Sequence, residues 1–340
     1  MKAWRAELYH YGIKGQKWGV RNGPPYPLHA KDHSASEKRA GWRKSLLGGT
    51  SGGLFGSTKS KNYRPSNAEI SEAAKRAARG SVHADANTQR IIADTRQRVY
   101  ERLGGKKKLD RNKMLTYQQK TYSDDDYTVK KGQEVQHITL DPNMKLGPHA
   151  RGGHLYVSTN EVDNKNYAGL YSGLRMLNDP RIKHVYAMKF KAADDLVTPS
   201  KKRRVENFLQ MYYDNPVSFA NDMAAWEQRY GLSYESTKKI AKRYMKMSLD
   251  ELSTEGYERF ASSWAMRTNT RDAYWERLKS QGYNAVMDDN DIKSGYFQSN
   301  TPLIVFNAVD HLAQVSIKEL TKAEAVRNME EWNDMAHTGL

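Results

Sequence analysis

The chain has no cysteine among its 340 residues. That absence excludes disulfide bonds, thiolate nucleophiles and zinc sites with cysteine ligands. No apolar run of about 18 residues occurs, so we expect no transmembrane helix and no membrane partner. The first residues also lack the apolar stretch of a secretory signal. These absences favour a chain that stays in a reducing cytoplasm or in a particle assembled there.

Catalytic motifs are equally scarce. The sequence contains no His-Glu-x-x-His, no Gly-x-Ser-x-Gly and no Gly-x-Gly-x-x-Gly after a predicted strand. The acidic stretch at 288–291 lacks the alternating ligands and the final glutamate of a calcium loop. It therefore predicts a carboxylate-rich turn, and we expect no metal.

Charge is distributed unevenly. Residues 1–120 hold 26 Lys and Arg against 9 Asp and Glu, a net charge of +17, while the remaining 220 residues carry −1. A basic arm ahead of a neutral body favours a polyanionic partner such as DNA, RNA or an acidic protein surface. The alternative is that the arm serves solubility alone.

The pattern of residues predicts an α+β fold behind the arm. Gly, Pro, Ser and Lys dominate 22–65, which indicates a flexible linker. Ser66 and Glu69 form a capping box, so 66–125 is expected to be a basic, partly disordered helical segment. Beyond it, 199–280 has helical spacing, and Thr321 caps a last helix over 321–340. Alternating apolar residues predict a strand at 134–140, and short strands are also expected at 154–158, 184–190, 283–287, 303–306 and 313–317.

Residues 9–21 combine aromatic residues with glycines inside the cationic arm. Exposed aromatic side chains are unfavourable unless a surface receives them, so this stretch predicts a short docking peptide. The alternative is a local turn folded onto the protein's own body. The stretch resembles the His-x-Gly-Ile-Lys-Gly-x-Lys-Trp-Gly-Val-Arg motif of virion-associated proteins from phages that infect Gram-positive bacteria. The motif residues are His10, Gly12, Gly15, Lys17, Trp18 and Gly19.

This first resemblance implies a place in the virion. Residues 1–21 would dock on phage head or portal proteins, and the basic arm would lie against packaged DNA or another polyanion. The protein would then act in the bacterial host cytoplasm.

A second resemblance covers 126–320. Gly-His-Leu-Tyr-Val-Ser-Thr-Asn, ending at Asn160 and followed by a helix, is similar to the central motif of mono-ADP-ribosyltransferases. The segments 282–291 and 302–307 are similar to the closing strands of phage-encoded proteins of that type. The resemblance implies a split mixed or antiparallel sheet with a large helical insertion at 199–280. It also implies NAD as the substrate and a host protein or nucleic acid as the acceptor.

The resemblance assigns residues to the NAD site. Ser158 and Thr159 match the Ser-Thr-Ser position, Tyr167 would stack on nicotinamide, and His137 would contact the adenylate half. Tyr156 and Tyr171 complete this set. The alternatives are a helix N-cap at 158–160, core aromatic residues, and a buried histidine.

The family's catalytic glutamate is missing. No Glu occurs between Glu276 and Glu319, and Gln298 lies near the expected place. Cleavage of the nicotinamide bond gives the ribose oxocarbenium character, which a carboxylate stabilises and a neutral amide does not. Catalysis would therefore fall to Asp288, Asp289 or Asp291. Otherwise the protein is an inactive minor head protein whose arm contacts DNA.

Overall fold

The computed structural model describes residues 63–79, 86–116, 125–146, 154–264, 268–293 and 299–336. The predicted docking peptide, most of the linker and Gln298 lie outside these residues. Within them the chain forms an α+β fold with antiparallel sheets, as the sequence predicted.

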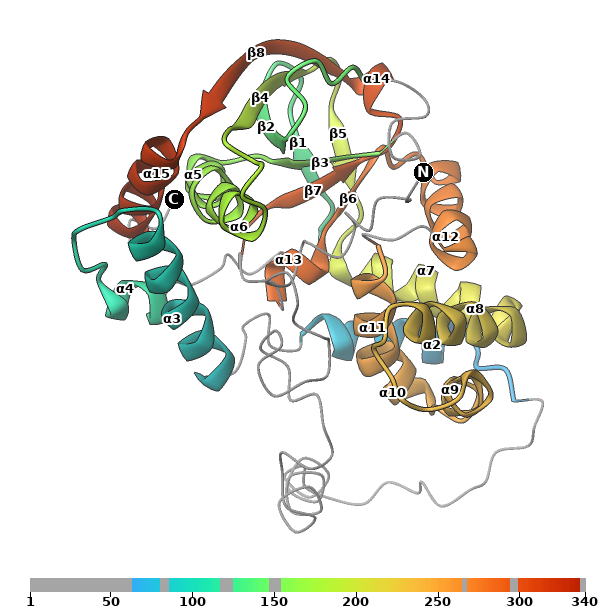
Figure 1. Ribbon diagram of the computed structural model, residues 1–340. Coiled ribbons are helices and arrows are strands. Elements are labelled where there is room, and N and C mark those ends of the chain that lie inside the picture. The colour runs from blue at the N-terminus through green and yellow to red at the C-terminus, as the bar shows by residue number, and fades with distance from the viewer. Residues whose placement is uncertain are drawn as a thin grey trace.

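A six-stranded sheet organises the fold (Figure 1). Its order is β6-β7-β3-β2-β4-β8, and every neighbouring pair is antiparallel. The strands are β2 (Glu134–Thr139), β3 (Leu155–Ser158), β4 (Val185–Ala192), β6 (Ala285–Met287), β7 (Pro302–Val305) and β8 (Leu312–Leu320). A second sheet pairs β1 (Tyr127–Val129) with β5 (Leu196–Thr198). The six predicted strands are confirmed, while β1 and β5 were not predicted.

The two faces of the large sheet bury different cores, because side chains alternate along each strand. Val135, Val157 and Leu303 face one core, which also contains Val129 of β1 and Leu196 of β5. The opposite face is covered by two separate groups of helices.

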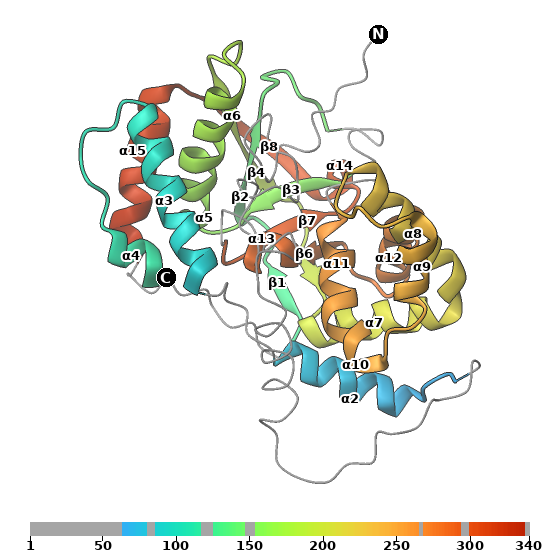
Figure 2. The same cartoon turned by 60° about the horizontal axis from the view of Figure 1, so that its bottom comes forward.

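The first group, called here the α3–α15 group, packs on β2 and β4 through residues such as Ile138 and Val185. It contains α3 (Ala86–Arg102), α4 (Arg111–Thr116), α5 (Glu161–Asn166), the π-helix η3 (Tyr167–Tyr171), α6 (Ser172–Asn178) and α15 (Lys322–Met335). Figure 2 shows these helices stacked together at one end of the sheet.

The second group, called here the insertion group, covers β6 and β7 through Val286 and Ile304. It contains α2 (Asn67–Ala78), α7 (Lys201–Asp214), α8 (Pro216–Arg229), α9 (Thr237–Tyr244), α10 (Leu249–Glu251), η4 (Leu252–Gly256), α11 (Tyr257–Ser262) and α12 (Asn269–Ser280). The helices from α7 to α12 fall within the predicted insertion at 199–280. Two short helices, α13 (Asp289–Lys293) and α14 (Ala308–His311), complete the described part.

Helices α2 and α3 belong to these two cores. The predicted capping box is confirmed, since Ser66 and Glu69 cap α2 reciprocally. Ile70 of α2 is buried in the insertion group, and Ile92 and Val99 of α3 are buried in the α3–α15 group. The domain was predicted to begin at residue 126, and the packing of the body includes these earlier helices.

Candidate functional site

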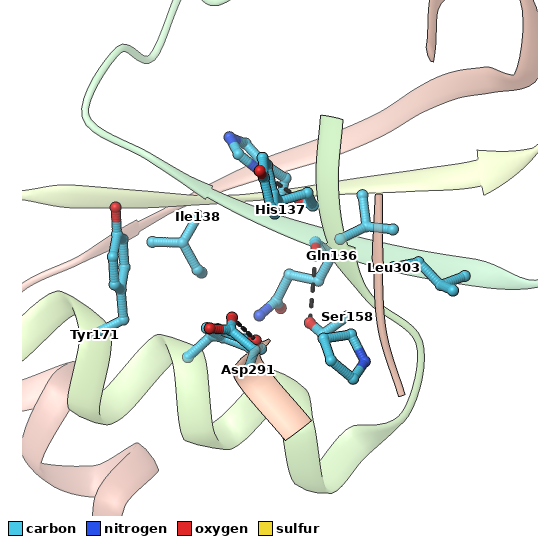
Figure 3. A pocket seen from close by; sticks show the side chains of 11 residues that line it. Gln136, His137, Ile138, Ser158, Tyr171, Asp291 and Leu303 are labelled. Atoms are coloured by element: carbon cyan, nitrogen blue, oxygen red, sulfur yellow. Dashed lines mark hydrogen bonds between the residues drawn. The ribbon is translucent and has the colours of Figure 1, made fainter. Parts of the chain in front are cut away.

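A cavity of about 40 Å³ opens between the two helix groups, on the sheet face that they share (Figure 3). Residues of β2, β3, β7, the π-helix and α13 line it. Six residues proposed from the sequence are among them: His137, Tyr156, Ser158, Tyr167, Tyr171 and Asp291. Five lining residues were not proposed: Gln136, Ile138, Val157, Pro302 and Leu303.

Ser158 and Gln136 lie directly opposite each other on β3 and β2. The Ser158 hydroxyl donates to Asn164 Oδ1 at 2.6 Å, and Gln136 Nε2 donates to the Asn164 carbonyl at 3.2 Å. Asn164 therefore fixes both side chains from the first turns of the following helix. Gln136 was not proposed from the sequence, because the alternation of a strand does not show which of its two faces lines a cavity.

His137 lies on the opposite face of β2 from Gln136. Its neighbour across the sheet is Met188, which is buried in the core on that other face. Figure 3 shows the imidazole directed away from Asp291. Its Nδ1 lies 2.6 Å from the carbonyl oxygen of Tyr156. Because a carbonyl only accepts, Nδ1 carries the hydrogen in this contact.

Tyr156 connects the cavity to the insertion group. Its ring packs against that core, and its hydroxyl donates to the carbonyl of Trp264 at 2.8 Å. The side chain therefore lines the cavity with its edge while its hydroxyl is used in packing.

Tyr167 and Tyr171 stand at the two ends of the π-helix. The wider turn of such a helix is frequent at functional sites. Gly169 between them permits close approach to α15, since a Cβ there would lie 2.8 Å from the backbone nitrogen of Met329. The Tyr167 hydroxyl donates to Asp291 Oδ2 at 2.6 Å. Burial, followed by the charge of Asp291, raises the pKa of Tyr167 well above its usual value, so the phenol stays neutral.

The three candidate aspartates have different surroundings. Asp289 receives two hydrogen bonds from Arg204, at 3.0 and 2.6 Å, and lies 3.1 Å from Lys201 Nζ. Burial alone would raise the pKa of Asp289, but the charges of Arg204 and Lys201 outweigh it and hold the pKa below its usual range. Tyr257 also donates to this carboxylate, at 2.5 Å. Asp289 is therefore part of a buried ion pair that ties α7 to α13.

Residues 201–204 are four consecutive cations, a pattern that usually faces solvent, but Arg204 does not. Its side chain is only 2% exposed because it faces Asp289.

Asp288 does not line the cavity. Its carboxylate accepts from the Asn290 backbone at 3.1 Å. Burial, followed by the charge of Asp291, raises the pKa of Asp288 well above its usual value. Asp288 is thus held neutral, and Asp291 is the candidate carboxylate that reaches the cavity.

Thr159 and Asn160 join β3 to β7 outside the cavity. Thr159 Oγ1 contacts the hydroxyl of Thr301 and donates to its carbonyl at 3.2 Å. Asn160 caps α5 by accepting from the backbone of Asp163 at 2.8 Å. The N-cap alternative is therefore confirmed at Asn160.

Asp163 was not proposed from the sequence. It is fully buried and accepts from the backbone nitrogens of Asn300 and Thr301 at 2.8 and 2.7 Å. Burial raises the pKa of Asp163 to about 6, although these hydrogen bonds oppose the shift. No sequence pattern marks such a residue, because its partners lie about 140 positions away.

Among the described residues, no group of three or more His, Cys, Asp or Glu side chains is arranged to hold a metal ion. In the same part of the chain, no helix is long and apolar enough to cross a membrane.

Comparison with protein-family models matches residues 1–25 to a family of unknown function, DUF7211. This range contains the predicted docking peptide. Searches of curated proteins and of solved structures found no match.

Proposed function

We propose that residues 126–320 form an NAD-binding domain of the ADP-ribosyltransferase type, carried by a virion-associated phage protein and acting in the host cytoplasm. The observation that supports this is the convergence of residues at the cavity. Ser158 and Tyr167 belong to one motif and its following helix, Asp291 belongs to a segment more than 120 positions later, and all three line one cavity. The antiparallel sheet and the insertion at the expected place agree with the proposal.

The reaction breaks the bond between ribose C1′ and the nicotinamide nitrogen, and the electron pair leaves with nicotinamide. An oxygen or nitrogen of the acceptor then supplies a pair to C1′ and loses a proton. Positive charge develops on the ribose between these events, and a fixed carboxylate stabilises it. In this proposal the carboxylate is Asp291, oriented by the Tyr167 hydroxyl.

The aromatic and polar side chains suit the nicotinamide end of NAD. Tyr167 and Tyr171 offer ring faces, and Gln136 and Ser158 offer groups that hydrogen-bond an amide or a ribose hydroxyl. The cavity, at about 40 Å³, has room for a water molecule but not for NAD. Ligand sites usually measure about 300 Å³ or more, so we expect the cavity to widen when NAD binds.

The test is release of nicotinamide from labelled NAD by the full-length protein, with and without host lysate as acceptor. Asp291→Asn keeps the size of the side chain and removes its charge, so we expect the rate to fall by about 100-fold. Asp310→Asn, at an exposed aspartate of α14, is the matched control and should keep the wild-type rate. Absence of both nicotinamide release and an NAD-dependent rise in melting temperature would refute this function.

A second candidate is a structural virion protein whose basic surface contacts DNA. The exposed cations of α3, α4 and their connection favour it: Arg98, Arg102, Lys106, Lys107, Lys108 and Arg111. Two of them face an acidic group, since Arg111 pairs with Asp94 at 2.9 Å and Lys107 lies 3.8 Å from Glu330.

DNA binding at several salt concentrations tests this candidate. Alanine at Arg102, Lys106 and Lys108 should weaken DNA binding equally for all sequences. The slope of the logarithm of the binding constant against the logarithm of salt concentration should decrease in size by about one for each lost phosphate contact. Alanine at Lys238, Lys239 and Lys242 of α9 provides the control. Equal DNA affinity of the two triple variants would exclude the α3–α4 surface as the DNA-binding site.

A further inference from the structure

Helix α13 is five residues long, and a helix of this length is not stable without contacts to its surroundings. It packs on α11 of the insertion group and on β7 of the sheet. Figure 1 and Figure 2 both show it between the two helix groups. The position of α13 is therefore set by what holds it, and its aspartates make contacts on both sides.

Three side chains of the insertion group converge on the carboxylate of Asp289: Lys201 and Arg204 of α7, and Tyr257 of α11. These three residues are called here the Asp289 socket. The Arg204 guanidinium makes two parallel hydrogen bonds to the carboxylate, which fix its direction as well as its position. Arg204 is itself held, since its Nη1 donates to the Pro199 carbonyl at 2.5 Å. The Lys201 ammonium lies 4.5 Å from the centre of the Tyr257 ring, so the socket residues also contact one another.

Asp289 and Asp291 point to opposite sides of α13, because residues two positions apart in a helix are about 200° apart around its axis. Asp289 faces the socket, and Asp291 faces the cavity, where its Oδ2 accepts from the Tyr167 hydroxyl at 2.6 Å. The three socket residues all belong to the described part of the chain, and none of them lines the cavity. A shift of α13 that takes Asp289 out of the socket therefore moves Asp291 as well.

We propose that the insertion group positions the carboxylate of Asp291: the socket around Asp289 fixes α13, and α13 holds Asp291 against Tyr167 in the cavity. Asp289, a catalytic candidate from the sequence, is in this proposal a positioning residue. The consequence for the reaction rests on the proposed NAD chemistry, whereas the coupling of the socket to Tyr167 does not.

A double-mutant cycle tests the coupling without NAD. Tyr257→Phe removes one hydroxyl from the socket, and Tyr167→Phe removes the hydroxyl that contacts Asp291. Once either contact is lost, α13 is less well held and the other contact contributes less. The decrease in melting temperature of the double variant should therefore be roughly a third smaller than the sum of the two single decreases.

Tyr212→Phe is the matched control for this cycle. Its buried hydroxyl donates to the Tyr244 carbonyl at 3.0 Å, so the substitution removes one hydrogen bond from the same helix group without touching α13. Combined with Tyr167→Phe, it should give a decrease in melting temperature equal to the sum of the single decreases.

The kinetics of nicotinamide release provide the second readout. Asp289→Asn keeps the size of the side chain and weakens its contacts with both cations of the socket. It should lower kcat by about ten-fold or more, because a small displacement of a reacting group is costly, and leave KM for NAD within about two-fold. Tyr257→Phe, the milder change, should lower kcat in the same direction if Asp289→Asn does not fold. Tyr212→Phe should keep both constants.

The results separate the two proposals. An additive cycle for Tyr257→Phe and Tyr167→Phe would overturn the coupling, and so would an equal departure from additivity in the Tyr212→Phe cycle, which means a general loosening of the core. Nicotinamide release with an unchanged kcat in both socket variants would overturn the positioning role. Absence of nicotinamide release by the wild type would refute the proposed NAD function alone, and the cycle would still decide the coupling.

Discussion

Replacing Arg204 with methionine should destabilise the protein strongly. The guanidinium is buried and donates twice to Asp289, so its loss leaves a buried carboxylate with fewer partners. Breaking a buried pair costs about 3–5 kcal/mol. Lys201 and Tyr257 still contact Asp289 in the variant, which favours the lower end, about 3 kcal/mol. Urea unfolding at neutral pH measures this loss.

The effect of this substitution should depend on pH. In the wild type the pKa of Asp289 is below its usual value, so its contribution to stability is present above the unfolded pKa and is lost as pH falls through the folded pKa. In Arg204→Met the lost positive charge lets the pKa of Asp289 rise. The buried carboxylate is charged at neutral pH, so the destabilisation relative to the wild type is largest there. The difference in the free energy of unfolding should therefore shrink as pH falls below about 4.

Arg203→Met is the matched control, because Arg203 is the next residue and its side chain is 59% exposed. Its pairing with Asp126 at 3.3 Å should contribute no more than about 1 kcal/mol. Equal losses in the two variants, or a loss in Arg204→Met that does not change with pH, would refute the role assigned to the buried pair.

Further predictions concern three other positions. The folded pKa of Asp163, about 6, is above its usual 3.8, so the stability that its neutral form gives is present below the unfolded pKa and is lost as pH rises through 6. The Asn side chain of Asp163→Asn does not titrate, so this variant does not lose stability in this way. The free energy of unfolding of the wild type, measured in urea relative to that of Asp163→Asn, should therefore fall by roughly 2–3 kcal/mol between pH 4 and pH 7. Gly169→Ala should destabilise by about 1–3 kcal/mol, because its Cβ would meet the Met329 backbone at 2.8 Å. Gly256→Ala in the other π-helix meets nothing closer than 3.3 Å, and equal melting temperatures for these two variants would contradict that reasoning. Tyr156→Phe removes one hydrogen bond and should cost about 1 kcal/mol, measured by thermal unfolding.

Local patterns allowed most of the fold to be predicted. The strands of the large sheet are marked either by alternation, as in β2, or by short apolar runs, as in β6 and β7, and capping residues mark the starts of α2 and α15. The strands β1 and β5 have three residues each, which is too short for a recognisable period. The π-helix Tyr167–Tyr171 has no sequence mark either, and it packs closely on α15 at Gly169.

Part of the candidate site could also be predicted. Ser158, Tyr167 and Asp291 were found because motif resemblance points to segments near the ends of strands and in the following helix. The pairing of Arg204 with Asp289 could not be found, because the two residues are 85 positions apart and a run of four cations usually faces solvent. The roles of the three neighbouring aspartates also depend on long-range partners.

The separate packing of α2 and α3 limits how far the protein can open. Helix α2, which ends at Ala78, is anchored in one helix group, and α3, which begins at Ala86, is anchored in the other. Eight residues of fully extended chain span at most about 29 Å, so these two anchor points can never separate further than that. A proteolytic cut between 79 and 85 would remove this tether while leaving both helices attached to their own cores.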